Sequence, residues 1–322
     1  MKRRTFLKGG LAATSFVAVS GLSYGKNLIY PVNSEMKYNT LGRTGVSVSR
    51  LGYGCAPLGW STLTQDEVNE LVLKAVNLGI NYFDTAPNYR KAEERMGEVV
   101  PSIREKIFLV SKTEAHDYDG TWRLLEQSLK RMKTDTIDLI HIHNLGLRRR
   151  FEDINYVLSE KGSLGALQKA KEQGIIRFIG ASGHVYPTRF HKAIDNEEID
   201  VLMNAVNYII RHVYNFEEKI WYRAMEKDMG LVAMKVFGGA VKRTDSRMNR
   251  DQHEMALRYA YSLPGLSTAV IGMKNMDELI ENVNAVNTIQ PLSDEEMHKL
   301  SQEGLRLARN EPWKQVHGRP VI

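Results

Sequence analysis

Residues 107–143 read IFLVSKTEAHDYDGTWRLLEQSLKRMKTDTIDLIHIH, and this stretch decides the fold class. The apolar runs at residues 107–113 and 137–143 each predict a buried strand. Between them Trp122, Leu125 and Leu129 recur at three- and four-residue spacing, which predicts an amphipathic helix over residues 120–132. A strand, a helix and a second strand in this order are typical of a parallel βαβ unit.

The same alternation continues in both directions along the chain. We expect eight strands, at residues 49–54, 80–84, 107–113, 137–143, 176–182, 201–207, 231–237 and 267–273, with helices such as 64–78 and 216–229 between them. No glycine-rich dinucleotide-binding fingerprint follows an early strand, which disfavours an open doubly wound sheet. The sequence therefore predicts an α/β protein: one (β/α)8 TIM barrel over residues 37–310, beginning with a β-hairpin that turns at 42–45. A last helix is expected at 293–307, and a C-terminal tail at 311–322.

The first 25 residues form a separate segment. Adjacent Arg3 and Arg4 precede Phe6, Leu7 and Lys8, and the apolar stretch that follows at 11–22 is too short to span a bilayer comfortably. This pattern resembles a twin-arginine export signal, so we expect the twin-arginine export machinery as a partner and the periplasm as the location. If the leader stays uncleaved, it would act as a membrane anchor. The alternative is a basic N-terminus without a targeting role.

Composition and charge narrow the classes of function. The chain has 322 residues, of which 43% are hydrophobic and 25% charged, as in ordinary globular proteins. Its formal net charge is +6, and all but one of these charges is accounted for by Lys2, Arg3, Arg4, Lys8 and Lys26. There is therefore no electrostatic case for a nucleic-acid partner. Cys55 is the only cysteine, which excludes an intrachain disulfide and a cysteine-based metal site.

Polar residues with catalytic potential follow three successive predicted strands. Asp84 ends the second strand, Tyr89 lies five residues later, Lys112 lies near the end of the third strand, and His143 ends the fourth. Each residue alone has a structural explanation, such as a helix cap for Asp84. However, the carboxyl ends of barrel strands meet at one face, where the active sites of such barrels form. We therefore expect these four side chains to converge.

His141 and His143 are one residue apart and point to the same side of a strand. Two imidazoles could form half of a zinc site, but the strands at 201–207, 231–237 and 267–273 end without further ligands. We expect no metal. The pair would then hold one catalytic residue and one packed residue. His141 lies one layer deeper, where barrel side chains mostly fill space, and is expected to be a hydrogen-bonded core residue.

From about residue 37 to residue 287 the chain resembles the aldo-keto reductase family. The matching stretches are KYNTLGRTGVSVSRLGYG (37–54), INYFDTAPNYRKAEERMG (80–97), FLVSKT (108–113), IDLIHIHN (137–144), IRFIGASGH (176–184) and ENV (281–283). The resemblance implies an Asp–Tyr–Lys–His tetrad at Asp84, Tyr89, Lys112 and His143. It also implies the NAD(P)H-dependent reduction of an aldehyde or ketone.

Physical chemistry gives each tetrad residue a role. A free tyrosine has a pKa near 10 and donates a proton reluctantly at neutral pH. A Lys112 ammonium beside Tyr89 would stabilise the phenolate and bring the tyrosine pKa toward the working range. Asp84 would keep that ammonium charged and oriented, and His143 would hydrogen-bond the substrate oxygen.

The resemblance further implies that a nicotinamide dinucleotide lies extended across the barrel mouth. The implied contacts, from the nicotinamide end to the adenosine end, are Ser182, Met234, Lys235, Phe237, Gly238, Lys274, Glu281 and Asn282. Met234 stands where the family has an aromatic residue, and Glu278 stands where it has an arginine. Lys274 could meet a 2′-phosphate, which favours NADP(H), with NAD(H) as the alternative.

The predicted loop after His143 bears on the substrate. Asn144 and Leu145 stand where family members often carry a tryptophan, and Arg148, Arg149 and Arg150 follow. These residues favour a polar or anionic carbonyl compound such as a sugar derivative. The alternative function is an exported nucleotide-binding sensor or regulatory subunit with little turnover. An exported enzyme would need an unknown redox partner, because the periplasm has no obvious route to regenerate NADPH.

Overall fold

The computed structural model describes residues 35–146, 151–238, 247–310 and 313. The expected export signal, Arg148, Arg149 and Arg150, and the expected tail apart from Trp313 lie outside these residues. The strands are β1 Tyr38–Thr40, β2 Ser47–Ser49, β3 Leu51–Gly54, β4 Tyr82–Asp84, β5 Phe108–Thr113, β6 Ile137–Ile142, β7 Ile176–Gly183, β8 Val201–Ala205, β9 Gly230–Met234 and β10 Leu266–Gly272. Strands β3 to β10 close into a barrel in the order β10-β3-β4-β5-β6-β7-β8-β9, and β1 pairs with β2 in a separate antiparallel sheet. The predicted (β/α)8 barrel with an N-terminal hairpin is confirmed.

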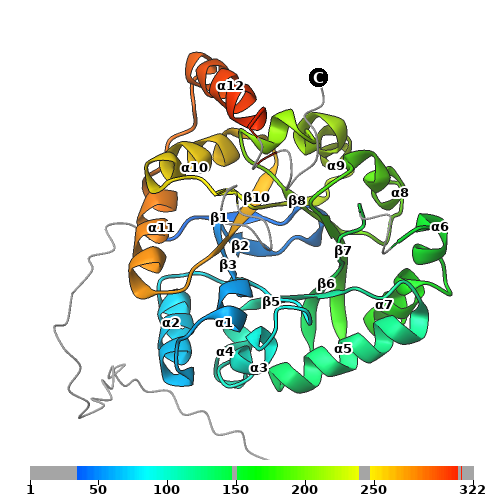
Figure 1. Cartoon of the computed structure of the whole chain (residues 1–322). Helices are drawn as coiled ribbons and strands as arrows, with labels where there is room; N and C mark the ends of the chain where they lie inside the picture. Colours follow the sequence, from blue (N-terminus) through cyan, green and yellow to red (C-terminus); the bar gives the residue numbers. More distant parts are fainter. Residues whose placement is uncertain (1–34, 147–150, 239–246, 311–312, 314–322) are drawn as a thin grey trace, which may run out of the picture. The chain divides into compact units, whose positions relative to one another are not determined.

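Helices surround the barrel strands (Figure 1). They are α1 Ala56–Trp60, α2 Gln65–Asn77, α3 Ala92–Met96, α4 Val100–Ile103, α5 Tyr118–Met132, α6 Ile154–Val157, α7 Ser163–Glu172, α8 His191–Ile194, α9 Tyr222–Glu226, α10 His253–Ser262, α11 Met276–Thr288 and α12 Asp294–Ala308. In the part of the chain that the structure describes, none of the helices is both long enough and apolar enough to cross a membrane.

Side-chain caps fix where the long helices begin. Thr64 forms a capping box with Glu67 at the start of α2, and Ser293 forms one with Glu296 at the start of α12. Asp117 caps α5 by accepting a hydrogen bond from the backbone N–H of Gly120. Each cap satisfies backbone donors that the first helical turn leaves unpaired. The helices thus begin within two residues of the positions expected from the apolar pattern.

The β1–β2 hairpin packs against the N-terminal ends of the barrel strands. Leu41 and Val48 are fully buried and belong to the apolar cluster that also contains Val232 from inside the barrel. Gly42, at φ 48°, lies so close to the start of β9 that a Cβ there would be 2.4 Å from the nitrogen of Gly230. The opposite, C-terminal end of the barrel is therefore the end left for a site.

Two buried carboxylates connect neighbouring strands at their N-terminal ends. Asp138 in β6 accepts a hydrogen bond from the N–H of Leu109 in β5 at 2.8 Å. Asp200, just before β8, accepts one from Ile179 in β7 at 3.1 Å. Arg104 neutralises Asp138 with a contact of 2.9 Å. These residues hold strand to strand on the side away from the tetrad.

Candidate active site

The four predicted catalytic residues lie together at the C-terminal ends of β4, β5 and β6. Lys112 is fully buried, and its Nζ donates to Oδ1 and Oδ2 of Asp84, each at 2.7 Å, and to the carbonyl oxygen of Thr85 at 2.7 Å. The same ammonium group also hydrogen-bonds Tyr89. The residues lie together because β4 pairs in parallel with β5 and β5 with β6, so the C-terminal ends of the three strands are side by side.

Tyr89 lies in the loop between β4 and α3, beside Lys112. The Lys112 Nζ is 4.9 Å from the centroid of the Tyr89 ring. A Cβ at Gly59 in α1 would lie 1.8 Å from the carbonyl oxygen of Tyr89, so only glycine allows α1 to pack this closely on the loop. The backbone position of the tyrosine is thereby fixed.

Burial and charge act in opposite directions on this cluster. Burial raises the pKa of Tyr89 above its usual value. The charge and hydrogen bond of Lys112 lower this pKa, but they do not outweigh burial and the nearby charge of Asp84, so the expected lowering of the tyrosine pKa is not seen. Burial works against a charged Lys112, but Asp84 and Tyr89 outweigh it and raise the pKa of that amine above its usual value. Lys112 is therefore a permanent ammonium at neutral pH, and its charge favours the phenolate form of Tyr89.

His143 follows β6 directly and faces the same cluster. Its ring centroid is 6.2 Å from that of Tyr89, with the two rings nearly perpendicular. Its Nδ1 is 3.2 Å from Oε1 of Glu114, and Asn88 donates a hydrogen bond to the same oxygen. Glu114 was not predicted from the sequence. Its position two residues after Lys112 was the available signal, because residues i and i+2 of a strand share a face.

His141 lies one layer deeper in the barrel and is completely buried. A Cβ at Gly180 would be 2.3 Å from its Nδ1, so the imidazole fills space that only a glycine on β7 leaves free. Burial, with a smaller effect of the Lys112 charge, lowers the pKa of His141 well below its usual value, and the ring is neutral. Among the described residues no three His, Cys, Asp or Glu side chains are grouped so as to hold a metal ion.

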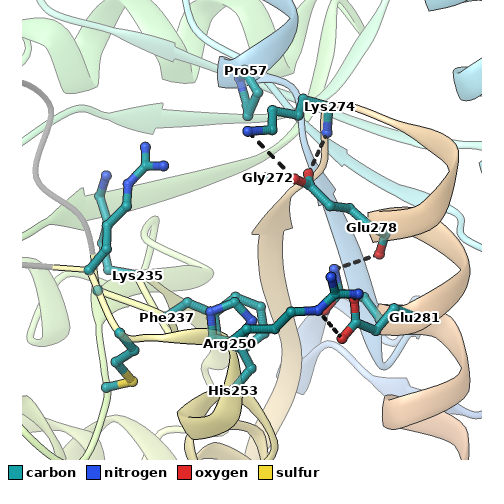
Figure 2. Close-up of a pocket in the computed structure, with 13 residues that line it drawn as sticks. Pro57, Lys235, Phe237, Arg250, His253, Gly272, Lys274, Glu278 and Glu281 are labelled. Atoms are coloured by element: carbon teal, nitrogen blue, oxygen red, sulfur yellow. Dashed lines mark hydrogen bonds and ion pairs between the residues drawn. The ribbon is translucent and has the colours of Figure 1, made fainter. Parts of the chain in front are cut away.

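A cavity of about 350 Å³ opens at the C-terminal ends of β9 and β10, and none of the four tetrad residues lines it. Six of the predicted cofactor-binding residues line it, namely Lys235, Phe237, Gly238, Lys274, Glu281 and Asn282. Figure 2 shows Lys235 on one side and Lys274, Glu278 and Glu281 on the other. The glycine at 238 has φ 72°, which gives the loop after β9 its turn.

Sequence reasoning missed several residues of this cavity, among them two arginines and a histidine. These three are Arg247, Arg250 and His253, which follow residues 239–246 in the chain. Arg250 Nε is 3.0 Å from Oε1 of Glu281, and His253 stacks on Phe237 with ring centroids 3.9 Å apart. No motif marks these residues, because Arg247 and Arg250 precede α10 and His253 begins it, so none of them lies at a strand end.

The cationic side chains that line the cavity favour the binding of an anion. Glu278 accepts a hydrogen bond from the backbone N–H of Lys274 at 2.9 Å, and its other carboxylate oxygen is 3.7 Å from the Lys274 Nζ. Burial, then Arg247, then Lys112 lower the pKa of Lys235 to about 8. Cations crowded in this way are stabilised by a bound polyanion such as a pyrophosphate.

The remaining two predicted cofactor residues, Ser182 and Met234, do not line this cavity. Ser182 in β7 is fully buried, and within the described residues its Oγ has no hydrogen-bond partner. Such an orphaned hydroxyl fits a polar group of a bound molecule, such as a carboxamide. Met234, the last residue of β9, is 6% exposed and packs in the apolar cluster inside the barrel with Met203. The residues present thus fit a dinucleotide.

Comparison with known proteins agrees with this geometry. The sequence matches the profile described as Aldo/keto reductase family over residues 50–254 and 245–303. It is 24% identical over 317 residues to L-galactose dehydrogenase from Arabidopsis thaliana, covering 87% of this chain and 98% of that protein. It is 23% identical over 334 residues to pyridoxal 4-dehydrogenase from Microbacterium luteolum, covering 82% and 96%.

A solved structure shares the fold. The holo form of an aldo-keto reductase from Bacillus halodurans superposes with a TM-score of 0.69 at 23% identity, covering 87% of this chain and 100% of that one. The family profile spans well over half of the chain. The chain therefore belongs to the aldo/keto reductase family and is an oxidoreductase that acts on CH–OH or carbonyl groups.

Proposed function

We propose that the protein is an NADP(H)-dependent carbonyl reductase that uses Tyr89 as the proton donor toward an aldehyde or ketone. The observation that carries the proposal is the buried Lys112 ammonium, held by Asp84 at 2.7 Å and lying 4.9 Å from the Tyr89 ring. An ion pair with only a structural role would not require a tyrosine next to the ammonium group. A proton donor does require such a neighbour, because the ammonium stabilises the phenolate left behind.

The residues of the chain divide the remaining tasks. Bound nicotinamide supplies the hydride. Tyr89 gives its proton to the substrate oxygen, Lys112 stabilises the resulting phenolate, and Asp84 keeps Lys112 in place. His143 hydrogen-bonds the substrate oxygen and aligns the carbonyl group. Ser182 would hold the carboxamide of the cofactor.

The cavity supports a phosphate-rich cofactor. We propose that Lys235 and Arg247 contact the pyrophosphate and that Lys274 and Arg250 contact the adenosine end, because all four side chains line the cavity. Because Glu278 pairs with the Lys274 ammonium and Glu281 with Arg250, these carboxylates oppose a 2′-phosphate less than unpaired carboxylates would. We therefore propose NADP(H) as the cofactor, with NAD(H) as the weaker ligand.

We propose a sugar-like carbonyl compound as the substrate. L-galactose dehydrogenase from Arabidopsis thaliana and D-threo-aldose 1-dehydrogenase from a Pseudomonas species, relatives at 24% identity, are named for sugars. Trp60 is 44% exposed and its ring centroid lies 6.0 Å from that of Tyr89. An exposed indole beside the proton donor offers a face on which the C–H groups of a sugar ring can pack.

Replacement of Tyr89 by phenylalanine tests the function. We expect kcat/KM for a panel of aldoses, aldehydes and ketones to fall at least about 100-fold, because the proton donor is lost. The dissociation constant for NADPH should stay unchanged. The matched control is Tyr222→Phe, since Tyr222 in α9 is 55% exposed and far along the chain from the tetrad. Tight NADPH binding by the native protein with no turnover of any carbonyl would instead support a sensor.

We also propose that the protein is exported to the periplasm through the twin-arginine machinery, on the strength of Arg3, Arg4 and the apolar stretch at 11–22. Continued turnover there would depend on a redox partner that reduces the bound cofactor.

A further inference from the structure

Asn144, the residue after His143, has a buried side chain whose oxygen lacks a partner. Asn144 is 9% exposed, and within the described residues its Oδ1 accepts no hydrogen bond. Folded proteins pair nearly all of their buried polar atoms, so an unpaired one calls for an explanation. Because Asn144 adjoins the proposed catalytic histidine, a bound substrate can supply the missing donor.

The backbone on both sides of Asn144 is fixed by hydrogen bonds. The N–H of His143 donates to the carbonyl oxygen of Thr113 in β5 at 2.8 Å, and the N–H of Leu145 donates to that of Ser182 in β7 at 2.9 Å. The Leu145 side chain is fully buried. Asn144 therefore occupies a defined place between the ends of β5 and β7, at the C-terminal end of the barrel where the tetrad lies.

The backbone conformation of Asn144 explains only part of this arrangement. Asn144 has φ 61°, a left-handed conformation that asparagine adopts more readily than most residues with a side chain. This conformation breaks the strand alternation, under which Asn144 and His143 would point to opposite faces. Glycine would adopt the same backbone without strain. The backbone thus accounts for the choice of a small polar residue, but not for a buried amide oxygen without a partner.

The unpaired atom determines which group of a substrate Asn144 can bind. An amide oxygen accepts hydrogen bonds and cannot donate them, so its partner must carry a proton. A carboxylate has no such proton at neutral pH, whereas a hydroxyl group has one. Neighbouring Cα atoms are about 3.8 Å apart, and the oxygens on two neighbouring carbon atoms of a sugar are separated by a similar distance. A carbonyl oxygen bound at His143 would therefore bring the hydroxyl group of the adjacent carbon within reach of Asn144.

We propose that Asn144 selects substrates with a hydroxyl group on the carbon next to the carbonyl, by accepting a hydrogen bond from that hydroxyl group. The inference rests on the proposed carbonyl reductase activity and narrows its substrates to α-hydroxy aldehydes and ketones, to which open-chain sugars belong. A substrate without this hydroxyl group leaves Oδ1 buried and unpaired in the transition state. Sites built to bind a hydroxyl group strongly reject analogues that lack it.

Lactaldehyde and propanal test this role, because they have the same carbon chain and differ by one hydroxyl group. With concentrations corrected for hydration, we expect the native enzyme to favour lactaldehyde about a hundredfold in kcat/KM. Asn144→Gly removes the carboxamide and tolerates φ 61°, and it should lower this ratio at least about tenfold. The matched control is Lys133→Gly, at the left-handed residue that ends α5, and it should keep the native ratio. Equal kcat/KM values for the two aldehydes in the native enzyme, or a ratio that Asn144→Gly leaves in place, would overturn the inference.

Binding measurements separate this role from a contact with the cofactor and from the activity itself. The dissociation constant for NADPH should be the same in the native protein and in Asn144→Gly. A rise of about tenfold or more in the variant would assign the carboxamide to the cofactor and contradict the proposal. Calorimetry on the NADP⁺-bound native protein should show tighter binding of propylene glycol than of propanol, and Asn144→Gly should abolish the difference. If that holds but no carbonyl compound is reduced, the proposed activity fails and the hydroxyl contact stands.

Discussion

At the scale of single residues, Lys235 links the cofactor cavity to the tetrad. It adopts φ 59°, a left-handed conformation that side-chain-bearing residues seldom occupy, directly after β9. Its amine lines the cavity, where burial, Arg247 and Lys112 lower its pKa to about 8. Such a lysine is charged at neutral pH and loses its charge within an accessible pH range.

Lys235→Met should therefore weaken NADPH binding and change its pH dependence. At pH 7 we expect roughly a tenfold to hundredfold higher dissociation constant, because one charge-assisted contact to a phosphate is lost. The native protein should lose affinity as the pH rises above about 8, where Lys235 becomes neutral. The Met variant should lack this decline. Isothermal titration calorimetry with Lys299→Met, an exposed lysine of α12, as the control would detect either pattern.

Three of the four tetrad residues were predictable from the ends of predicted strands. Asp84, Lys112 and His143 close three successive apolar runs, and all three lie in the cluster. Glu114 shares the strand face of Lys112, but its place beside His143 depends on the fold, which no sequence spacing contains. Arg250 is remote from any strand end and pairs with Glu281, 31 residues away.

At the scale of elements, the helix expected over residues 216–229 has an irregular start. Residues Glu217–Trp221 form a π-helical turn before α9. Glu217 is buried, and Tyr259 in α10 donates a hydrogen bond to its Oε1 at 2.8 Å. Burial raises the pKa of Glu217 to about 7. Apolar periodicity could not reveal this turn, because its partner lies 42 residues away.

Glu217→Gln should stabilise the protein at neutral pH. In the native protein the folded carboxyl has a higher pKa than the unfolded one, so stability declines as the pH rises from about 4.5 to about 7. The shift corresponds to a loss on the order of 3 kcal/mol by pH 7. Calorimetric melting at pH 5 and pH 7.5 should show a smaller decline for Glu217→Gln. Glu105→Gln, at an exposed carboxylate that does not act on the Glu217 pKa, should leave the native decline unchanged. An equal decline in Glu217→Gln would contradict the assignment.

Strand limits show the same local dependence. The strand expected over residues 231–237 ends at Met234, because the left-handed Lys235 begins a turn closed by the N–H of Gly238. The strand expected from residue 80 begins at Tyr82, since the Asn81 side chain bonds the N–H of Ser49 across to β2. Single residues thus determine where these strands begin and end, and the apolar pattern of the sequence, which extends over several residues, cannot show this.

At the scale of the whole molecule, the barrel was predictable because eight apolar runs alternate with helices and no dinucleotide fingerprint is present. Each strand then pairs in parallel with its sequence neighbours, and β10 closes on β3. The alternation of strands and helices does not predict the cofactor preference or the cellular location of the protein. They depend on loop residues and on the leader, whose chemistry lies outside the barrel pattern.

Export can be tested on the full chain in a bacterial host that has the twin-arginine machinery. Changing Arg3 and Arg4 together to lysine should move the protein from the periplasmic to the cytoplasmic fraction, because the receptor reads the arginine pair. Immunoblots of the two fractions measure the change. Lys26→Gln, which removes one charge and keeps the pair, should not alter the distribution. Equal periplasmic amounts with and without the arginines would refute export by this route.

The strand-connecting carboxylates Asp138 and Asp200 sit at the pole of the barrel remote from the chemistry. The side chains that connect neighbouring strands are thereby separated from the loops that would contact the substrate. Mouth loops can be lengthened, trimmed or grafted from other reductases without disturbing those connections. Redesign of this protein for a new substrate can therefore exchange the loops at the C-terminal end of the barrel and keep the N-terminal end unchanged.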